Sequence, residues 1–314
     1  DKMFLMKQSF VIPKEVLRVT EGLEEKGFEA FIVGGCVRDL LIGKEPKDWD
    51  VTTNATPEQI QEIFPDTFYE NSFGTVGVEN KETENEKLKV IEVTPYRIEG
   101  KYSNNRHPDE VKFSQKLEDD LMRRDFTMNA IAYNPSKEKL VDLYNGASDI
   151  KDKMIRAVGK AEDRFEEDAL RILRAVRFAA QHGFAIEHET MSAMQKKSEL
   201  LSNISAERIR DEFLKMVDSA EPMVGVMMSQ RLGILKFIVP ELEIGIGVKQ
   251  NGEHIYDVWE HNLRTMQHAA DKGWLLHIRL AGLFHDIAKP HTRAWSKEKN
   301  DYTFYGHEVV GAKI

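Results

Sequence analysis

Two acidic side chains stand two positions apart at Asp48 and Asp50, shortly after the pair Gly34-Gly35. On a strand, residues i and i+2 point to the same face, so the two carboxylates would be held close together. Like charges at such a distance are costly unless a cation lies between them, and Mg²⁺ with nucleotide phosphates suits that place. The glycines let the backbone approach a polyphosphate, and Arg38 follows in the first turn of the next helix. The spacing therefore predicts a site for metal and phosphate.

A third carboxylate is predicted at Glu92, in the stretch Val90–Pro95 that is expected to be a strand. Two-metal transferases commonly use three acids, so we expect Glu92 to join Asp48 and Asp50. The alternative is an outward-facing strand residue without a metal.

The elements that must position these acids change in kind along the chain. Up to residue 150 helices and strands mix, with helices expected over 13–27, 37–42 and 58–64 and strands over 28–33, 49–52, 75–78 and 90–95. Beyond residue 150 the expected helices are 163–182, 187–200, 206–219, 222–232, 256–272 and 275–288. We therefore expect an α+β protein: a head with a mixed sheet (1–150), an all-α neck (151–215) and a helical body (216–314).

Composition bounds what these elements can do. The chain has 314 residues, of which 41% are hydrophobic and 31% charged, as in about two folded domains. A net charge of −9 argues at first against a nucleic-acid partner, yet the acidic excess lies in residues 1–150. One cysteine excludes an internal disulfide and a Cys-rich metal site, which fits a cytoplasmic setting. No stretch approaches the roughly 20 apolar residues of a membrane span, so we expect no membrane partner.

The stretch from Gly34 to Asp50 resembles the signature GGxVRDxLxGxxxxDxD of the class II tRNA nucleotidyltransferase (CCA-adding) and bacterial poly(A) polymerase family. Further stretches resemble the family's other motifs in the same order: Arg123 to Thr127, Asp142 to Gly159, Glu167 to Arg171, and Glu207 to Ile209. The resemblance implies a nucleotidyltransferase head that holds Mg²⁺ on Asp48 and Asp50. It also implies template-independent addition of CMP and AMP, from CTP and ATP, to the 3′ end of tRNA with release of pyrophosphate.

Asp168 and Arg171 stand three positions apart on an expected helix and so would share a face. A carboxylate accepts hydrogen bonds and a guanidinium donates them. Cytosine and adenine both offer an amine donor beside a ring-nitrogen acceptor, whereas uracil and guanine present the reverse. Such a pair therefore selects C and A without a nucleic-acid template, and the resemblance gives Asp168 and Arg171 this role.

The resemblance implies roles for further residues. Arg174 and Arg177 extend the cationic face beside the nucleotide, and we expect a positive strip along the neck and body. Arg124 and Asp125 match positions that hold the ribose and the sugar–phosphate end. Arg106, in the segment 102–108, matches a flexible loop needed to switch from C to A addition. An A-adding enzyme or a poly(A) polymerase remains the alternative within the family.

A second candidate metal site consists of His261, His285, Asp286 and His307. Three histidines and one aspartate on separate helices can converge on a divalent cation. Their order resembles the HD phosphohydrolase superfamily, whose distal Asp we expect beyond residue 314. Both a working site and an inert relic stay open. The alternative from another class is therefore an HD metal-dependent phosphohydrolase with an RNA-binding first half, and the sequence predicts no oligomeric state.

Overall fold

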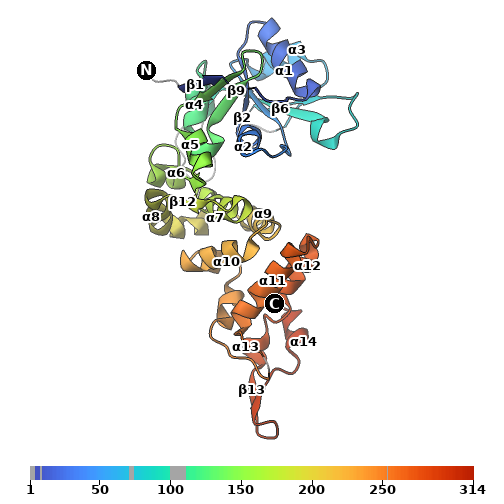
Figure 1. Ribbon diagram of the computed structural model, residues 1–314, viewed down its shortest axis with the longest axis vertical. Coiled ribbons are helices and arrows are strands. Elements are labelled where there is room, and N and C mark those ends of the chain that lie inside the picture. Colours follow the sequence, from blue (N-terminus) through green and yellow to red (C-terminus); the bar gives the residue numbers. More distant parts are fainter. Residues whose placement is uncertain (1–3, 8, 71–73, 100–110, 253) are drawn as a thin grey trace. The chain divides into compact units, whose positions relative to one another are not determined.

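The computed structural model describes residues 4–7, 9–70, 74–99, 111–252 and 254–314. The chain divides into two compact units, Asp1–Glu167 and Asp168–Ile314 (Figure 1). The finer division into head, neck and body stays a prediction. Among the described residues, no helix combines the length and the apolar character needed to cross a membrane.

The first unit is built on a mixed sheet, as expected. Within its described residues the sheet has eight strands in the order β1-β10-β9-β2-β3-β6-β5-β4. Strands β3 and β6 run parallel, and the other neighbouring pairs run antiparallel. The strands of this unit are β1 (Phe4–Lys7), β2 (Ala30–Val33), β3 (Asp50–Thr53), β4 (Thr67–Tyr69), β5 (Val76–Glu79), β6 (Val90–Pro95), β7 (Arg97–Glu99), β8 (Val111–Phe113), β9 (Ile131–Asn134), β10 (Lys139–Asp142) and β11 (Met154–Ile155).

Local signals set the helices of this unit. Pro13 precedes α1, and the Thr56 hydroxyl and the Gln59 side chain form a capping box that starts α3. Gly43, with φ +79°, ends α2 in the left-handed conformation. The helices are α1 (Lys14–Glu25), α2 (Gly35–Ile42), α3 (Pro57–Ile63), α4 (Leu117–Met122), α5 (Gly146–Lys151) and α6 (Ala161–Glu167).

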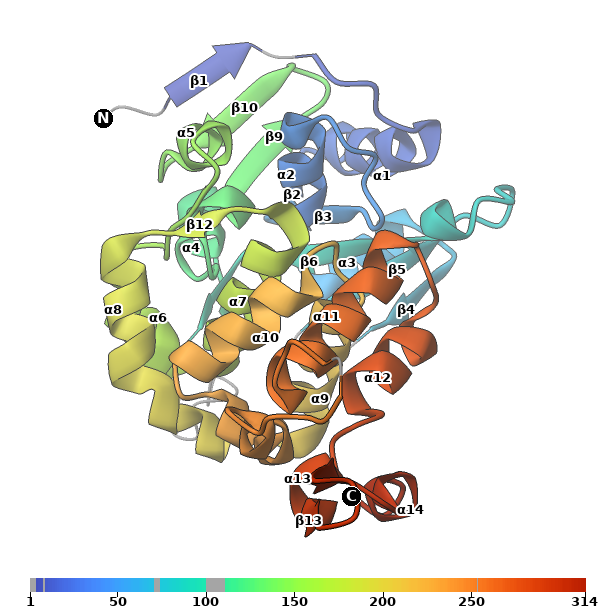
Figure 2. The same cartoon turned by 60° about the horizontal axis from the view of Figure 1, so that its bottom comes forward.

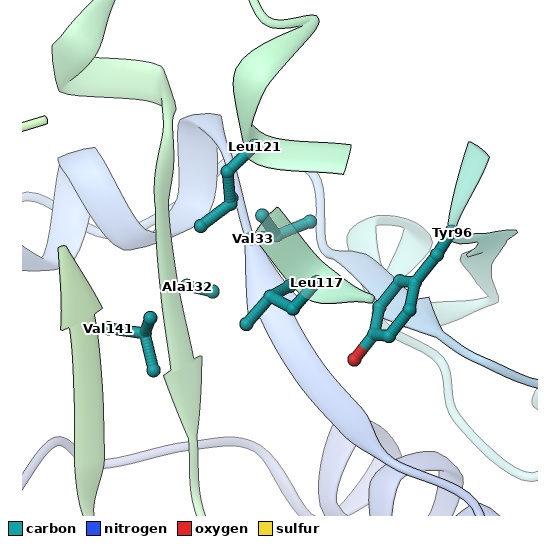
Figure 3. Packing of buried hydrophobic residues seen from close by; sticks show 6 residues of the cluster. All are labelled: Val33, Tyr96, Leu117, Leu121, Ala132 and Val141. Carbon is teal, nitrogen blue, oxygen red and sulfur yellow. The ribbon is translucent and has the colours of Figure 1, made fainter. Parts of the chain in front are cut away.

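Helix α4 packs on one face of the sheet and thereby fixes the segment that follows it. Leu117 and Leu121 of α4 lie in a buried cluster with side chains from β2, β9 and β10 and with Tyr96, which follows β6 (Figure 3). The members of the cluster are Val33, Tyr96, Leu117, Leu121, Ala132 and Val141. Because these side chains are almost fully buried, the position of α4 on the sheet is set by packing.

The second unit is mostly helical. Helix α7 packs on α9 and α10, α10 on α11, and α11 lies beside α12 (Figures 1 and 2). A side chain at Gly225 would meet Met216 Cγ at 2.6 Å, so only glycine allows α10 this approach. The elements are α7 (Leu170–His182), β12 (Ala185–Ile186), α8 (His188–Lys197), α9 (Ala206–Val217), α10 (Pro222–Arg231), α11 (Val258–Asp271), α12 (Leu276–Phe284), α13 (Lys289–Thr292), β13 (Ala294–Ser296), β14 (Asp301–Thr303) and α14 (His307–Gly311).

The structure corrects three details of the expected helices. The helix predicted over 163–182 is interrupted between α6 and α7, so Asp168 precedes α7 instead of lying within a helix. The helix predicted over 275–288 stops at Phe284, and a new helix begins where Pro290 suits the first turn. The predicted body is also not entirely helical, because β13 and β14 form a hairpin in which Trp295 makes an edge-to-face contact with Tyr302. The predicted neck contains the short strands β11 and β12.

Candidate active site and metal centre

Strand β3 brings two of the predicted acids to one side of the sheet. Asp48 lies in the bend before β3, Asp50 is the first residue of the strand, and Trp49 between them is 5% exposed. The charge of Asp48 acts on Asp50, so the two carboxylates lie near each other. In the parallel pairing of β3 with β6, Asp50 stands opposite Glu92. The structure thus brings the third predicted acid next to the other two.

The carboxylates of Asp48, Asp50 and Glu92 form a group with excess negative charge. Burial, Asp48 and Asp120 raise the pKa of Asp50, while Arg124 acts to lower it. Glu92 is exposed as a residue, but desolvation of its carboxylate and the charges of neighbouring acids, Asp50 first, raise its pKa to about 7. A hard divalent cation relieves such repulsion, so these carboxylates fit Mg²⁺ by their chemistry.

Gly34 makes room for a guanidinium beside the acids. Its φ of +83° favours glycine, and a Cβ there would lie 2.8 Å from Arg124 Nη1 and 3.7 Å from Asp50 Oδ2. Any larger residue would therefore displace Arg124. Gly34 and Arg124, predicted from separate motifs, are neighbours in the structure.

Arg124 is held by an acid that the sequence analysis did not single out. Asp120 on α4 is fully buried and accepts bonds from Arg123 (2.6 Å) and from Arg124 Nη2 (3.0 Å). Burial acts to raise the pKa of Asp120, but the two guanidinium groups outweigh it, so that its pKa lies below the ordinary value. The available signal was the spacing, since Asp120 stands three and four positions before the two arginines.

Arg38 and Asp125 belong to one buried polar network. The Arg38 guanidinium donates to Asp39 Oδ1 at 2.8 Å and, through Nη1, to Asn129 Oδ1 at 2.9 Å. Asn129 in turn donates to Asp125 Oδ1 at 3.0 Å. A Cβ on Gly35 would make ordinary contact with Arg38 Nη2 at 3.6 Å. Arg38 is 6% exposed, so these contacts fix its place in the fold, and its binding of phosphate stays a prediction.

The predicted flexible-loop residue Arg106, with the segment 102–108, lies outside the described residues. Its role in nucleotide switching stays a prediction.

Asp168, in the second unit, is paired with Arg208, a contact that the sequence did not predict. Its carboxylate accepts two bonds from Arg208, at 2.7 and 3.3 Å, and one from the backbone N–H of Leu170 at 3.1 Å. Asp168 thus precedes α7 as a helix-starting residue, whereas Arg171 lies within α7 and is 8% exposed. The structure places both residues at one helix end but adds Arg208 as the partner that orients the carboxylate.

Arg174 and Arg177 of α7 both pair with Glu212 of α9. Arg177 Nε donates to Glu212 Oε2 at 2.6 Å, and its guanidinium lies 4.0 Å from the Phe178 ring centroid. Arg174 Nη1 lies 3.8 Å from Glu212 Oε1. Arg177 is buried and Arg174 is half-buried, so the expected cationic face is partly neutralised by an acid that the sequence did not indicate.

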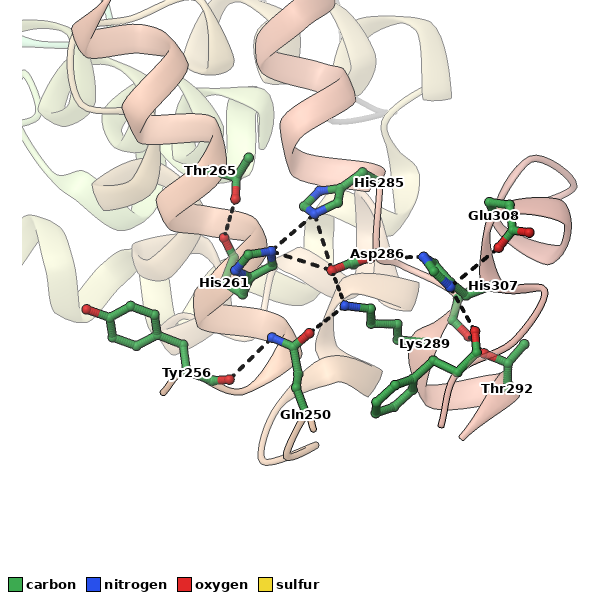
Figure 4. Close-up of polar contacts among 12 residues, drawn as sticks. Gln250, Tyr256, His261, Thr265, His285, Asp286, Lys289, Thr292, His307 and Glu308 are labelled. Carbon is green, nitrogen blue, oxygen red and sulfur yellow. Dashed lines mark hydrogen bonds and ion pairs between the residues drawn. The ribbon is translucent and has the colours of Figure 1, made fainter. Parts of the chain in front are cut away.

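The four residues of the second candidate site lie close together, and their binding of a metal stays a prediction. His261 on α11, His285 and Asp286 after α12, and His307 at the start of α14 come together in one module (Figure 4). Donor atoms of His261, His285 and Asp286 all lie within 4.8 Å of one another. In the described part of the chain, the three acids of the first unit do not meet this spacing.

Backbone contacts orient the histidines of this cluster. His285 Nδ1 lies 2.8 Å from the Gly282 carbonyl oxygen, and His307 Nδ1 lies 2.8 Å from that of Phe304. In a neutral ring the N–H then sits on Nδ1 and Nε2 carries the lone pair, as metal-binding histidines require. Gly282 also lets α12 approach α11, because a Cβ there would lie 3.3 Å from the Met266 backbone nitrogen.

Asp286 is compensated by neighbouring positive charge. Burial acts to raise its pKa, but His285 and Lys289 hold the pKa of Asp286 well below its usual range. Burial and the nearby His285 lower the pKa of His261, which favours a neutral ligand. The nitrogen and oxygen donors fit a borderline cation such as Zn²⁺ or Co²⁺ better than Mg²⁺.

Comparison with known proteins gives these two sites a family context. Residues 30–156 match the poly A polymerase head domain, residues 183–244 match a probable RNA and SrmB-binding site of polymerase A, and residues 258–314 match the HD domain. The head and the HD domain both imply dependence on divalent metal.

Relatives named CCA-adding enzyme support the same family assignment. The chain is 48% identical over 205 residues to that of Lactobacillus delbrueckii subsp. bulgaricus, covering 64% of this chain and 50% of the relative. It is 43% identical over 243 residues to that of Lactococcus lactis subsp. lactis, covering 77% and 59%. The chain thus spans about half the length of the curated relatives it matches.

A solved structure agrees with the sequence relatives. The Bacillus stearothermophilus CCA-adding enzyme in complex with CTP is similar with a TM-score of 0.65 and 37% identity, over 73% of this chain and 54% of that one. With the head motifs in order and the histidine cluster in the HD domain, the chain belongs to the class II tRNA nucleotidyltransferase and bacterial poly(A) polymerase family and carries a C-terminal HD domain.

Proposed function

We propose that this protein adds CMP and AMP, from CTP and ATP, to the 3′ end of tRNA without a template and releases pyrophosphate. The observation that carries the proposal is the group of Asp48, Asp50 and Glu92, whose mutual repulsion calls for a divalent cation, beside Gly34 and Arg124. Relatives named CCA-adding enzyme at 43–48% identity support the choice of reaction.

In this proposal Asp48, Asp50 and Glu92 would hold Mg²⁺, and the bound ion would supply positive charge for the triphosphate and for the RNA 3′-hydroxyl. The chain's own residues bind and orient the substrate. Gly34 makes room for Arg124 beside Asp50, and the backbone there can approach phosphate closely. Arg124, which Asp120 holds in place, offers a guanidinium to the sugar–phosphate end of the nucleotide.

Asp168 and Arg171 select the base in the same proposal. Asp168 keeps acceptor capacity because each carboxylate oxygen has two lone pairs, beyond the bonds from Arg208 and Leu170. The Arg208 contact holds the carboxylate in one orientation, which a selective hydrogen bond to an amine needs. A base with a carbonyl at that place would leave the carboxylate facing an acceptor, and this mismatch is what rejects it.

The test uses three tRNA substrates: one lacking CCA, one ending in C and one ending in CC, each given labelled CTP or ATP separately. We expect CTP to be added to the first two and ATP to the third. ATP addition alone, or long A tails, would replace the proposal by the A-adding or poly(A) alternative. Asp66→Asn, at an exposed acid of the same unit paired with Lys81, is the matched control for Asp48→Asn.

A second candidate activity is metal-dependent phosphohydrolysis in the HD domain. The convergence of His261, His285, Asp286 and His307 favours it. His285→Ala should abolish hydrolysis of a generic phosphomonoester and leave nucleotide addition unchanged. Cys36 is free and buried, which supports the reducing, cytoplasmic setting expected for both activities.

A further inference from the structure

Lys289 lies against the same oxygen that the histidine cluster would offer to a metal. Its Nζ is 2.6 Å from Asp286 Oδ2, and that oxygen is 3.2 Å from His285 Nε2 and 3.5 Å from His261 Nε2 (Figure 4). Lys289 is 8% exposed and also donates to Gln250 Oε1 at 2.6 Å. An ammonium group is therefore built into the cluster.

His261 Nε2, His285 Nε2 and Asp286 Oδ2 form a triangle, and its edges match the distances between neighbouring ligands of one metal ion. The two histidine nitrogens are 3.2 Å apart, and the other two edges are 3.2 and 3.5 Å. With metal–ligand bonds of about 2.1 Å, tetrahedral and octahedral ligands stand roughly 3.0 to 3.4 Å apart. Little rearrangement of these three side chains is needed to hold a transition-metal dication.

The metal-free cluster needs positive charge for the same reason that it fits a metal. The contacts of His285 Nδ1 with the Gly282 carbonyl oxygen and of His307 Nδ1 with that of Phe304 turn Nε2 of both rings toward Asp286. A lone pair that faces a carboxylate oxygen is repelled unless a cation or a proton lies between them. Lys289 supplies such a cation on Oδ2.

An ammonium and a divalent cation on one carboxylate oxygen repel each other at short range, the more so where water is partly excluded. We propose that the HD cluster is a cation-exchange site, in which Lys289 neutralises Asp286 in the metal-free protein and must leave Oδ2 when a transition-metal dication binds. Gln250 retains the displaced ammonium. The affinity for metal is then set by competition with Lys289, independently of the nucleotide-adding activity.

The experiment titrates the full chain with Co²⁺ and follows the visible absorption of the histidine-bound ion. We expect Lys289→Met to bind Co²⁺ at least tenfold more tightly than the unmodified protein. Lys289→Arg, which keeps the charge, should not gain affinity. His261→Ala should remove the absorption in every background, which separates this site from the acids of the first unit.

A thermal measurement supplies the second readout. Without metal, Lys289→Met should melt lower than the unmodified protein because Asp286 loses its counter-charge, and saturating Co²⁺ should raise its melting temperature by more. Lys289→Gln, which retains a hydrogen-bond donor without the charge, serves if the Met variant does not fold. Lys236→Met, at a lysine paired with Glu199 in the same unit, is the control and should change neither quantity.

Weaker binding of Co²⁺ by the neutral Lys289 variants would contradict the proposal. If Lys289 supports the metal instead of competing with it, the neutral variants bind Co²⁺ more weakly and gain less melting temperature from it. Unchanged or weaker binding in a folded Lys289→Gln variant overturns the proposal.

Discussion

Two groups of carboxylates in this protein have opposite charge balance. In the first unit, burial and neighbouring acids raise the pKa of Asp50, and desolvation and Asp50 raise that of Glu92 to about 7. In the second unit, His285 and Lys289 hold the pKa of Asp286 well below its usual range. The first group is short of positive charge, whereas the second carries its own.

This difference in charge balance predicts how readily each site binds a metal ion. In the first unit Arg124 neutralises the acids only in part, because the pKa of Asp50 stays raised. An external dication there gains the uncompensated attraction, as suits a reaction that uses metal with each nucleotide. Where Lys289 already neutralises the acid, a metal has to compete for it. Four predictions can break or sharpen this contrast.

The largest effect is expected from Asp50→Asn in the first unit. Removing one charge from the metal-binding acids should lower nucleotide addition to tRNA by about a thousandfold, since several kcal/mol of transition-state stabilisation is lost. The rate is measured with labelled CTP at saturating Mg²⁺, with Asp66→Asn as the control. A loss of less than tenfold would remove Asp50 from the catalytic group.

Stability should respond in opposite directions at the two sites. Asp286→Asn leaves the buried Lys289 without its counter-charge, at a cost of about 3 kcal/mol of unfolding free energy. Asp50→Asn should not destabilise the metal-free protein, because it relieves repulsion. Urea unfolding in EDTA measures both.

The double variant Asp286→Asn/Lys289→Met checks the cause of this loss. Removing both partners should recover much of the stability, because the cost comes from the unpaired charge. Equal losses in the single and double variants would show that Asp286 acts by some contact other than Lys289.

A smaller effect is expected at Asp120, which positions Arg124 beside the acids. Asp120→Asn should lower kcat/KM for CTP by about tenfold, the value of one charged hydrogen-bonded contact. Glu118→Gln, at an exposed acid of the same helix, is the control. Because Asp120 acts through Arg124, adding Asp120→Asn to Arg124→Ala should cause little further loss. Additive losses would contradict the positioning role.

The part of the first unit around Gly34 follows from its sequence because local patterns set it, whereas β1, β9, β10 and α4 were not predicted. The strand before Gly34, the helix after it and the strand of Asp50 all lie where apolar runs and glycines predict them. The facing of Asp50 and Glu92 is consistent with the prediction of three neighbouring acids, although their catalytic role is untested. Fold class and family were likewise predictable, since motif order carries them.

The sequence did not show the contacts and the element ends that depend on tertiary packing. Asp120 follows two other acids on α4, and only burial distinguishes it from them. The break before α7 lies in a stretch of good helix formers, where the Asp168 side chain bonds a backbone N–H at the start of α7. The hairpin of β13 and β14 has strands of three residues, too short for an alternating pattern to be recognised.

The smallest expected effect is the pH dependence that Glu92 gives to the stability of the first unit. The folded pKa of Glu92, about 7, lies above its ordinary value of 4.5, so the folded protein binds this proton more tightly than the unfolded chain does. Stability therefore falls as the pH rises from about 5 to 8 and Glu92 must ionise beside Asp50. In EDTA, Glu92→Gln should raise the melting temperature at pH 8 and leave it nearly unchanged at pH 5.

Asp286 should not change the pH dependence of stability between about pH 5 and 8. Its folded pKa is lowered, so its contribution to stability is complete above the unfolded value of about 4 and is lost only in stronger acid. Mg²⁺ should erase the advantage of Glu92→Gln at pH 8, because a bound dication compensates the acids in place of a proton. If the advantage persists at saturating Mg²⁺, Glu92 does not share the cation of Asp50, and the contrast between the two sites then rests on Asp50 alone.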